Sequence, residues 1–369
     1  MTERIRFKPL VLFIGALVMI SIIEIRMIRN QHFTHYNFIR LVKVSEAILE
    51  GRAPFRAFQN RFLGPIIAKS ITSFTGLSFE TTCKLLIMGT LILTNLLCAV
   101  FFYDLTRNRK TALAYTGTQT LLFILLQHSM YIHIFDFFEF LIFLIFAYLI
   151  FRKARVIFFI ILYAVGLLNG EAALFIAFWI ILDSFEYSKA VIFSLRTKKL
   201  PQMAIGVSII VFGVLYTYWI REFLFKSSII ESIGQDSTHA VIGNHIYLLD
   251  NLQDLLVRNW LSLNLFVTFF FTGMIVFFIR IMKRTDSDTM YKAALLCLVM
   301  LAAILVMGIV NETRVYFRFI PFLTMMWYYV GCPGKCDIHK NSRLLWSCTS
   351  GHKQKCSQII EQEIKCHQI

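Results

Sequence analysis

The sequence predicts an all-α integral membrane protein: a bundle of about eight to ten transmembrane helices, with interfacial amphipathic helices in the first outer loop. Three observations predict this class. Of the 369 residues, 57% are hydrophobic and only 16% are charged, and the mean hydropathy is +0.67. Apolar runs of membrane-spanning length recur along most of the chain, and charged and turn residues crowd into the interval 29–84. A soluble domain of this size would need far more polar surface.

An apolar run needs about 20 residues to cross the ~30 Å hydrocarbon core of a bilayer as a helix. The first run follows three basic residues, as in a signal peptide, but it has no small-residue cleavage pattern, so we expect it to remain as the first span. The runs that come close to this length are Pro9–Ile28, Leu85–Tyr103, Thr111–Gln127, Tyr131–Phe151, Met203–Ile220, Trp260–Met282, Ala293–Val310 and Val315–Gly331.

The apolar run from Val156 to Phe185 is too long for one simple span and is interrupted by Asn169-Gly170-Glu171. We expect two short half-helices, broken at Asn169-Gly170, that enter and leave on the same side. Backbone groups released at such a break must be covered by protein or face a water-filled cavity.

Basic residues predict the orientation of the chain, because cytoplasmic loops carry an excess of lysine and arginine. A cytoplasmic N-terminus places 23 of the 37 basic residues inside and 14 outside, although seven of the outer ones lie between Arg29 and Lys69. The net charge of +15 therefore reflects topology and contact with anionic membrane lipids, and no nucleic-acid partner is expected.

Residues 1–331 are expected to form the transmembrane domain, with outer loops at about 29–84 and 221–258. Apolar residues recur at near-helical spacing from Phe38 to Leu49, which predicts an interfacial helix ended by Gly51 and Pro54. A second helix is expected after Gly64, and another surface helix from His245 to Val257.

Residues 332–369 form a basic, Cys-rich tail, expected in the cytoplasm, whose composition allows disorder. Its cysteine and histidine residues could hold zinc, but their spacing matches no standard zinc pattern. Free thiols, or a tail altered by a change of reading frame, are the alternatives that the spacing favours. The other three cysteines lie in or beside apolar runs, where a small buried thiol is expected. They are Cys83, Cys98 and Cys297.

Under this topology, four polar groups meet on the outer side, and they supply the candidate catalytic carboxylates. Asp136 and Glu139 are three residues apart and share one helical face. Such a carboxylate could accept a proton from a hydroxyl nucleophile or coordinate a divalent metal ion, and the alternative is an acid at headgroup level. Glu171 could instead begin a half-helix and act as its cap. The candidates are Glu46, Glu50, Asp136 and Glu171.

Arginines on the same side are candidates for holding an anionic group, because guanidinium binds phosphate through two hydrogen bonds and keeps its charge. Arg318 lies in an apolar segment and needs an acidic partner, such as Glu312 or an acid on another helix. A structural salt bridge is the alternative reading. The candidate substrate-binding residues are Arg61, Asn169, Glu312, Arg314 and Arg318.

Three stretches resemble bacterial polytopic membrane proteins related to the GT-C glycosyltransferase superfamily. They are Glu50–Arg56 with Asn60–Pro65 in the first outer loop, Asn169-Gly170-Glu171 in the broken helix, and the late segment Asn311–Pro321. The resemblance implies a polyprenyl-phosphate-linked sugar donor, a glycan, lipid or protein acceptor, and chemistry on the outer face of the bacterial inner (plasma) membrane.

The sequence departs from that family at His35-Tyr36-Asn37, where the superfamily's inverting enzymes carry an acid early in the first outer loop. Either the acid lies elsewhere, at Glu46, Glu50 or Asp136, or the chain does not catalyse the reaction. On this reading, Arg61 and Arg314 hold the polyprenyl phosphate. A polysaccharide polymerase that uses lipid-linked repeat units and a non-enzymatic transporter or flippase are the alternatives. No glycine-rich phosphate loop supports a nucleotide-dependent enzyme or pump.

Overall fold

The computed structural model describes residues 3–33, 36–52, 59–127, 133–187, 194–195, 199–225, 246–262 and 264–331. These residues are helical almost throughout, apart from one two-residue antiparallel pair. Residues 1–325 form one compact unit, and of the rest the structure describes only the end of the last helix. The tail at 332–369, with its zinc and free-thiol alternatives, lies outside the described residues.

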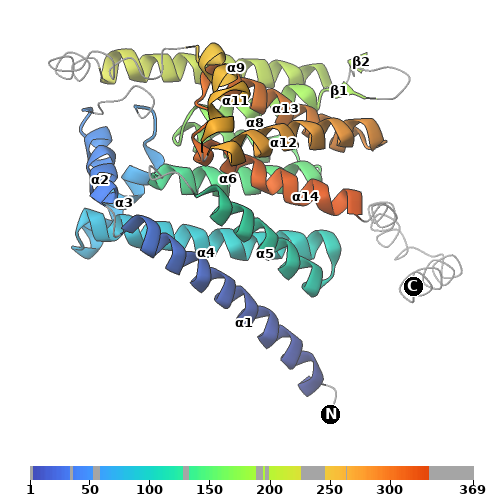
Figure 1. Ribbon diagram of the computed structural model, residues 1–369, viewed down its shortest axis with the longest axis horizontal. Helices are drawn as coiled ribbons and strands as arrows, with labels where there is room; N and C mark the ends of the chain where they lie inside the picture. Colours follow the sequence, from blue (N-terminus) through green and yellow to red (C-terminus); the bar gives the residue numbers. More distant parts are fainter. Residues whose placement is uncertain are drawn as a thin grey trace, which may run out of the picture. The chain divides into compact units, whose positions relative to one another are not determined.

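The N-terminal half contains α1 (Glu3–Ile28), η1 (Arg29–Phe33), α2 (Tyr36–Leu49), α3 (Leu63–Thr75), α4 (Phe79–Thr106), α5 (Arg109–Leu126), α6 (Ile134–Phe151), α7 (Val156–Leu167), η3 (Glu171–Ala173) and α8 (Leu174–Leu182). The C-terminal half contains β1 (Phe185–Glu186), β2 (Ser194–Leu195), α9 (Leu200–Trp219), η5 (Ile220–Leu224), α11 (Leu248–Leu256), η6 (Arg258–Leu261), α12 (Leu265–Arg284), α13 (Asp288–Met307), η7 (Thr313–Phe319) and α14 (Ile320–Gly331). Figure 1 shows these elements.

Six helices of the described chain are long and apolar enough to cross a membrane. They are α1 with η1, α4, α6, α9 with η5, α12 and α13. The prediction of an all-α, multi-pass membrane protein is therefore confirmed. The run Thr111–Gln127 also becomes a helix, α5, of 18 residues.

The run Val315–Gly331 differs from the single span that we expected. Its first residues belong to the 3-10 helix η7, and only then does the 12-residue helix α14 begin. Pro321 is the second residue of α14, where its missing N–H costs nothing, whereas in the interior of a longer helix it would break a hydrogen bond.

Helix α6 is the centre of the unit, since most of its 18 residues are buried. Its phenylalanines pack against neighbouring elements. The Phe123 ring of α5 stacks on Phe140 with ring centroids 4.8 Å apart, and it lies 4.5 Å from the Phe317 ring of η7. This packing holds the N-terminal half of α6 next to η7, and the candidate site lies there.

The broken hairpin is present as expected: α7 and α8 pack side by side and the chain turns at Asn169-Gly170. Gly170 has φ +145°, a conformation that residues with a side chain rarely adopt. The Leu168 carbonyl at the break accepts hydrogen bonds from the backbone N–H groups of Phe62 (2.8 Å) and Leu63 (2.9 Å). The segment at the start of α3 therefore covers backbone that the break would otherwise leave unsatisfied.

The amphipathic helices that we expected beside the long spans are also present. In α2, Phe38, Leu41 and Ile48 are buried, whereas Arg40 and Lys43 are exposed. Gly51, with φ +70°, ends this helix, and α11 occupies most of the second expected surface helix.

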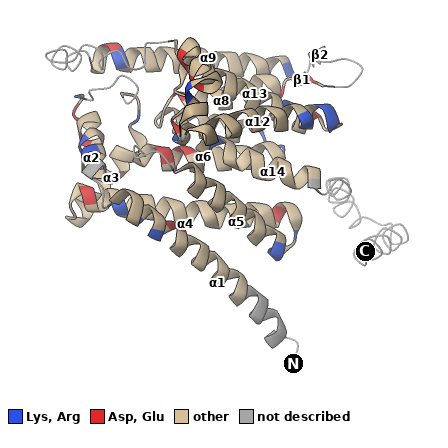
Figure 2. Ribbon diagram, viewed as in Figure 1, with Lys and Arg blue, Asp and Glu red and all other residues tan. Residues whose placement is uncertain are grey.

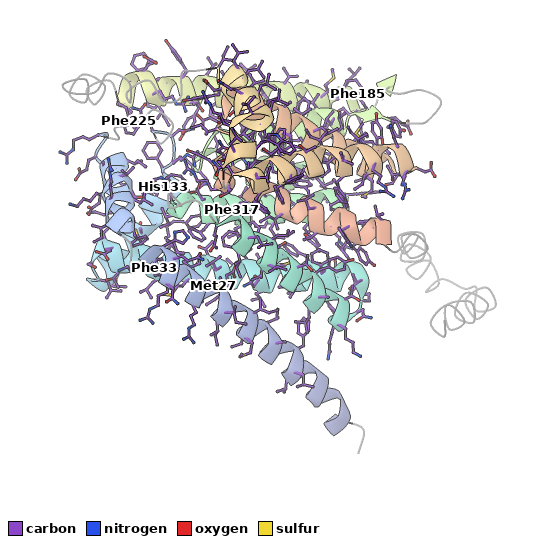
Figure 3. All side chains as sticks on the ribbon, in the orientation of Figure 1. Met27, Phe33, His133, Phe185, Phe225 and Phe317 are labelled. Atoms are coloured by element: carbon purple, nitrogen blue, oxygen red, sulfur yellow. The ribbon has the colours of Figure 1, made fainter. Side chains whose placement is uncertain are left out.

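Charged residues gather toward helix ends and around the start of α6, and most of the length of the long helices is uncharged, although α1 carries Glu24 and Arg26 within its span (Figure 2). Figure 3 places Phe33, His133 and Phe225 toward one end of the unit and Phe185 toward the other. We refer to the first of these as the α6 N-terminal end. Of these labelled residues, Phe33 and Phe225 belong to the two predicted outer loops, 29–84 and 221–258.

Candidate functional site

The first two turns of α6 carry the two most deeply buried carboxylates of the candidate site, Asp136 and Glu139. The Asp136 carboxylate accepts a hydrogen bond from the backbone N–H of His133 at 2.7 Å. An acid in the first turn satisfies a helix N–H that has no partner within the helix and complements the helix dipole. Glu139 lies one turn further along the same face.

Asp136 lies between two arginines that come from distant parts of the sequence. Arg61, just before α3, places Nη1 3.6 Å from one carboxylate oxygen, and Arg314 of η7 places Nη1 3.4 Å from the other. The Arg61 guanidinium also lies 4.3 Å from the centre of the Phe135 ring. Asp136, Arg61 and Arg314 were all predicted as site residues from the sequence, and the structure brings them together.

Arg314 has a second acidic partner in Glu312. Its Nη2 and Nε lie 2.8 and 3.1 Å from the same Glu312 oxygen. Burial lowers the pKa of Arg314, but Asp136 and Glu312 more than offset this and raise its pKa above the ordinary value. Arg314 therefore carries its full charge in the site.

Arg318 pairs with Glu139, with Nη2 2.8 Å from Oε1. This pair and the Asp136–Arg314 pair link α6 to η7 at two successive turns of α6. The Nε of Arg318 is buried and has no hydrogen-bond partner among the residues that the structure describes. The expected acidic partner on another helix is therefore Glu139.

Asn169 connects the hairpin break to α6, because its side-chain N–H donates to the Phe135 carbonyl at 2.9 Å. Its side-chain oxygen is buried and finds no donor within the described ranges. A small pocket beside it has room for roughly one water molecule. The pocket lining includes Glu139, Asn169 and Gly170.

Glu171 follows the break and forms an ion pair with Arg221. Arg221 belongs to η5, a π-helical turn that continues α9. Arg221 was not among the residues predicted from the sequence. It could have been found there, because it ends an apolar run on the same predicted side as Glu171, an acid for which the sequence suggested no basic partner.

Glu46 and Glu50 do not join this group, although both were nominated as catalytic acids. Glu46 lies exposed on α2, and Glu50 forms an exposed ion pair with Arg52. The interfacial helix directs these two acids to solvent because its other face is buried.

Four arginines and four carboxylates thus balance one another at the α6 N-terminal end; we call this group the arginine–carboxylate cluster. Its members are Arg61, Arg221, Arg314, Arg318, Asp136, Glu139, Glu171 and Glu312. In the described part of the chain, no three His, Cys, Asp or Glu side chains are placed to hold a metal ion. The divalent-metal alternative therefore lacks a ligand set among these residues.

Comparison of the chain with family models, curated proteins and solved structures found no match. Evidence for the function of this chain therefore has to come from its own residues, above all from the arginine–carboxylate cluster.

Proposed function

We propose that this protein is a membrane glycosyltransferase of GT-C type, which transfers a sugar from a polyprenyl-phosphate-linked donor on the outer face of the bacterial inner membrane, in cell-envelope glycan synthesis. The observation that carries the proposal is the position of Asp136 between Arg61 and Arg314. The resemblance of the three sequence stretches to GT-C proteins gives the reaction class.

The two arginines suit the leaving group of such a transfer. When the sugar leaves, negative charge develops on the polyprenyl phosphate, and charges that are already in place stabilise it. The contacts of Arg61 and Arg314 with Asp136, at 3.6 and 3.4 Å, are longer than the ~2.7–2.9 Å of a strong charge-assisted hydrogen bond. Neither arginine is locked in a tight pair with Asp136, and a phosphate would compete with Asp136 for both guanidinium groups and with Glu312 for Arg314.

The Asp136 carboxylate then becomes the general base that activates the acceptor. Once the arginines contact the phosphate, its carboxylate loses part of their stabilisation and becomes a better proton acceptor. It can take the proton of an acceptor hydroxyl as that oxygen attacks the sugar. Glu171 is the second choice for this role, because its ion pair with Arg221 lies at the adjoining hairpin break.

The test is an assay in liposomes that contain the purified protein and radiolabelled polyprenyl-phosphate sugars. Formation of a labelled glycan or glycolipid with donor on the outer-face side is the expected result. Addition of a single sugar supports the transferase, and growth of a polymer from lipid-linked repeat units supports the polymerase. Absence of any transferred label, with donors of several sugar types, contradicts the proposal.

One observation favours a second candidate, a transporter or flippase for a lipid-linked or anionic substrate. The hairpin of α7 and α8 breaks at the arginine–carboxylate cluster, and broken helices also form substrate sites in transporters. The same liposomes separate the two functions. Movement of labelled lipid across the bilayer without a chemical product supports the carrier.

A further inference from the structure

A second buried polar group lies within the spans, away from the arginine–carboxylate cluster. Glu24 of α1 is only 1% exposed. The side-chain nitrogen of Asn95, on α4, lies 2.6 Å from a Glu24 carboxyl oxygen and 3.3 Å from the Ser21 hydroxyl. The Asn95 side-chain oxygen accepts a hydrogen bond from the Thr120 hydroxyl of α5 at 3.0 Å. Side chains of three helices are therefore joined by hydrogen bonds that run from Thr120 through Asn95 to the Glu24 carboxyl group.

The polar side chains lie on the buried faces of their helices. On α1, Ser21 and Glu24 lie on the same face as the buried Leu17 and Ile28. On α5, Thr120 is buried as well. The contact of the three helices therefore encloses a carboxyl group, an amide and two hydroxyl groups.

Glu24 differs from the acids of the arginine–carboxylate cluster because no lysine, arginine or histidine in the described part of the chain forms an ion pair with it. An ionised carboxylate without a cation is costly in a buried, membrane-embedded position, whereas a neutral carboxylic acid is not. A neutral acid also gains a donor O–H for which buried acceptors are at hand.

The surrounding groups favour a proton over a metal cation. Asn95 presents its N–H groups, not its oxygen, to Glu24 and Ser21. A sodium ion bound at Glu24 would therefore meet donor hydrogens. The titratable neighbour is Cys98 on α4, which interacts electrostatically with Glu24. His32, about two turns further along in η1, is also buried. Arg26 on α1 and Arg29 at the start of η1 are both exposed.

We propose that Glu24, Asn95, Ser21 and Thr120 form a reversible proton-binding site in the membrane interior, with the proton held on the Glu24 carboxyl at neutral pH. The site is independent of the proposed glycosyl transfer. It gives the protein a group that can exchange a proton in response to pH without changing the arginine–carboxylate cluster.

Infrared difference spectroscopy of the full chain in lipid tests the proposal, because a protonated carboxylic acid has a carbonyl stretch that an ionised carboxylate lacks. We expect this band at neutral pH, its shift in heavy water, its loss and recovery as the pH is raised and returned, and its absence in Glu24→Gln. Glu46→Gln, which changes an exposed acid on α2, serves as the matched control and should leave the band unchanged.

Four outcomes would overturn the assignment. A band missing at neutral pH, or still present in Glu24→Gln, would mean that Glu24 is ionised or that another group holds the proton. A band that persists at every alkaline pH in a protein that stays folded would make Glu24 a permanently neutral structural acid. Loss of the band when sodium replaces choline at constant pH would identify a sodium site instead.

Discussion

Asp136 is the residue on which the charges of the arginine–carboxylate cluster depend. It faces Arg61 from the first outer loop and Arg314 from η7, and all three side chains are largely shielded from solvent. Removal of one partner from a buried ion pair leaves an uncompensated charge and costs about 3–5 kcal/mol. A substitution here can therefore act through folding as well as through chemistry, and each test must measure both.

Arg314→Lys should reduce transferase activity by about 100-fold while the folded yield stays close to that of the parent protein. The lysine keeps a positive charge opposite Asp136 and Glu312 but cannot bind a phosphate through two parallel hydrogen bonds. Activity in liposomes and the yield of monodisperse protein in detergent are the two measurements. Arg258→Lys is the matched control, because Arg258 forms an exposed ion pair with Asp254.

Arg314→Gln separates the two roles of this arginine. If Arg314 serves only as a partner for Glu312 and Asp136, Arg314→Gln and Glu312→Gln should both lower the folded yield and leave activity per folded molecule near the parent value. Unchanged specific activity in Arg314→Gln would refute phosphate binding at this residue.

The pair between Arg318 and Glu139 predicts a different outcome, since its contact at 2.8 Å is tight and links α6 to η7. Glu139→Gln should destabilise the protein by about 3 kcal/mol because it leaves a buried guanidinium without its acid. The double variant Glu139→Gln/Arg318→Met should recover most of that loss. Thermal unfolding in detergent measures both, and a double variant no more stable than Glu139→Gln would argue against a direct pair.

At the scale of elements, close packing of α9 against α7 and α8 depends on glycines. A Cβ at Gly213 would overlap the Tyr163 hydroxyl, and a Cβ at Gly206 would lie 2.6 Å from the Ile181 side chain. The Tyr163 hydroxyl cannot move freely, because it donates to the Ile209 carbonyl at 2.6 Å. Small residues at these positions let the helices approach one another, as is common between transmembrane helices.

Gly213→Ala should therefore destabilise the protein by about 1–3 kcal/mol through overpacking. In a Tyr163→Phe background the same substitution should cost less, since the overlapping oxygen is gone. Thermal unfolding of the two single variants and the double variant measures the coupling. Gly117→Ala is the control, because a Cβ there meets no atom within 4 Å, and equal losses in Gly117→Ala and Gly213→Ala would contradict the packing argument.

At the scale of the whole molecule, we predict the orientation in the membrane from the basic residues, because a cytoplasmic N-terminus would place 23 of them inside and 14 outside. Glu46 and Lys110 are both exposed, the first on α2 and the second near the start of α5. In a background without other reactive cysteines, an impermeant thiol reagent added from outside should label Glu46→Cys and not Lys110→Cys. Both positions should react once the membrane is permeabilised.

The reverse labelling pattern would place the arginine–carboxylate cluster on the cytoplasmic side. The proposed use of an outer-face donor would then fail, although the contacts within the cluster would be unaffected. Labelling at both positions in intact cells would indicate mixed insertion, which the seven outer basic residues between Arg29 and Lys69 could promote.

The sequence by itself determined the features that depend on local chemistry and on the membrane. Hydrocarbon thickness sets the length of an apolar helix, so the class of the protein and most long spans could be predicted from hydropathy. The break at Asn169-Gly170 was also predictable, because glycine and a polar residue interrupt an otherwise apolar run. The helix α2 followed from its spacing of apolar residues.

Only the tertiary structure decided which of the nominated residues act together. Arg314 and Asp136 are 178 positions apart, and nothing local distinguishes Asp136 from Glu46 as an acid that arginines surround. The choice follows from packing: α6 is buried on nearly every side, so its two acids must meet cations from other elements, whereas α2 leaves its acids in water. The same long-range packing pairs Glu171 with Arg221 and Glu24 with Asn95.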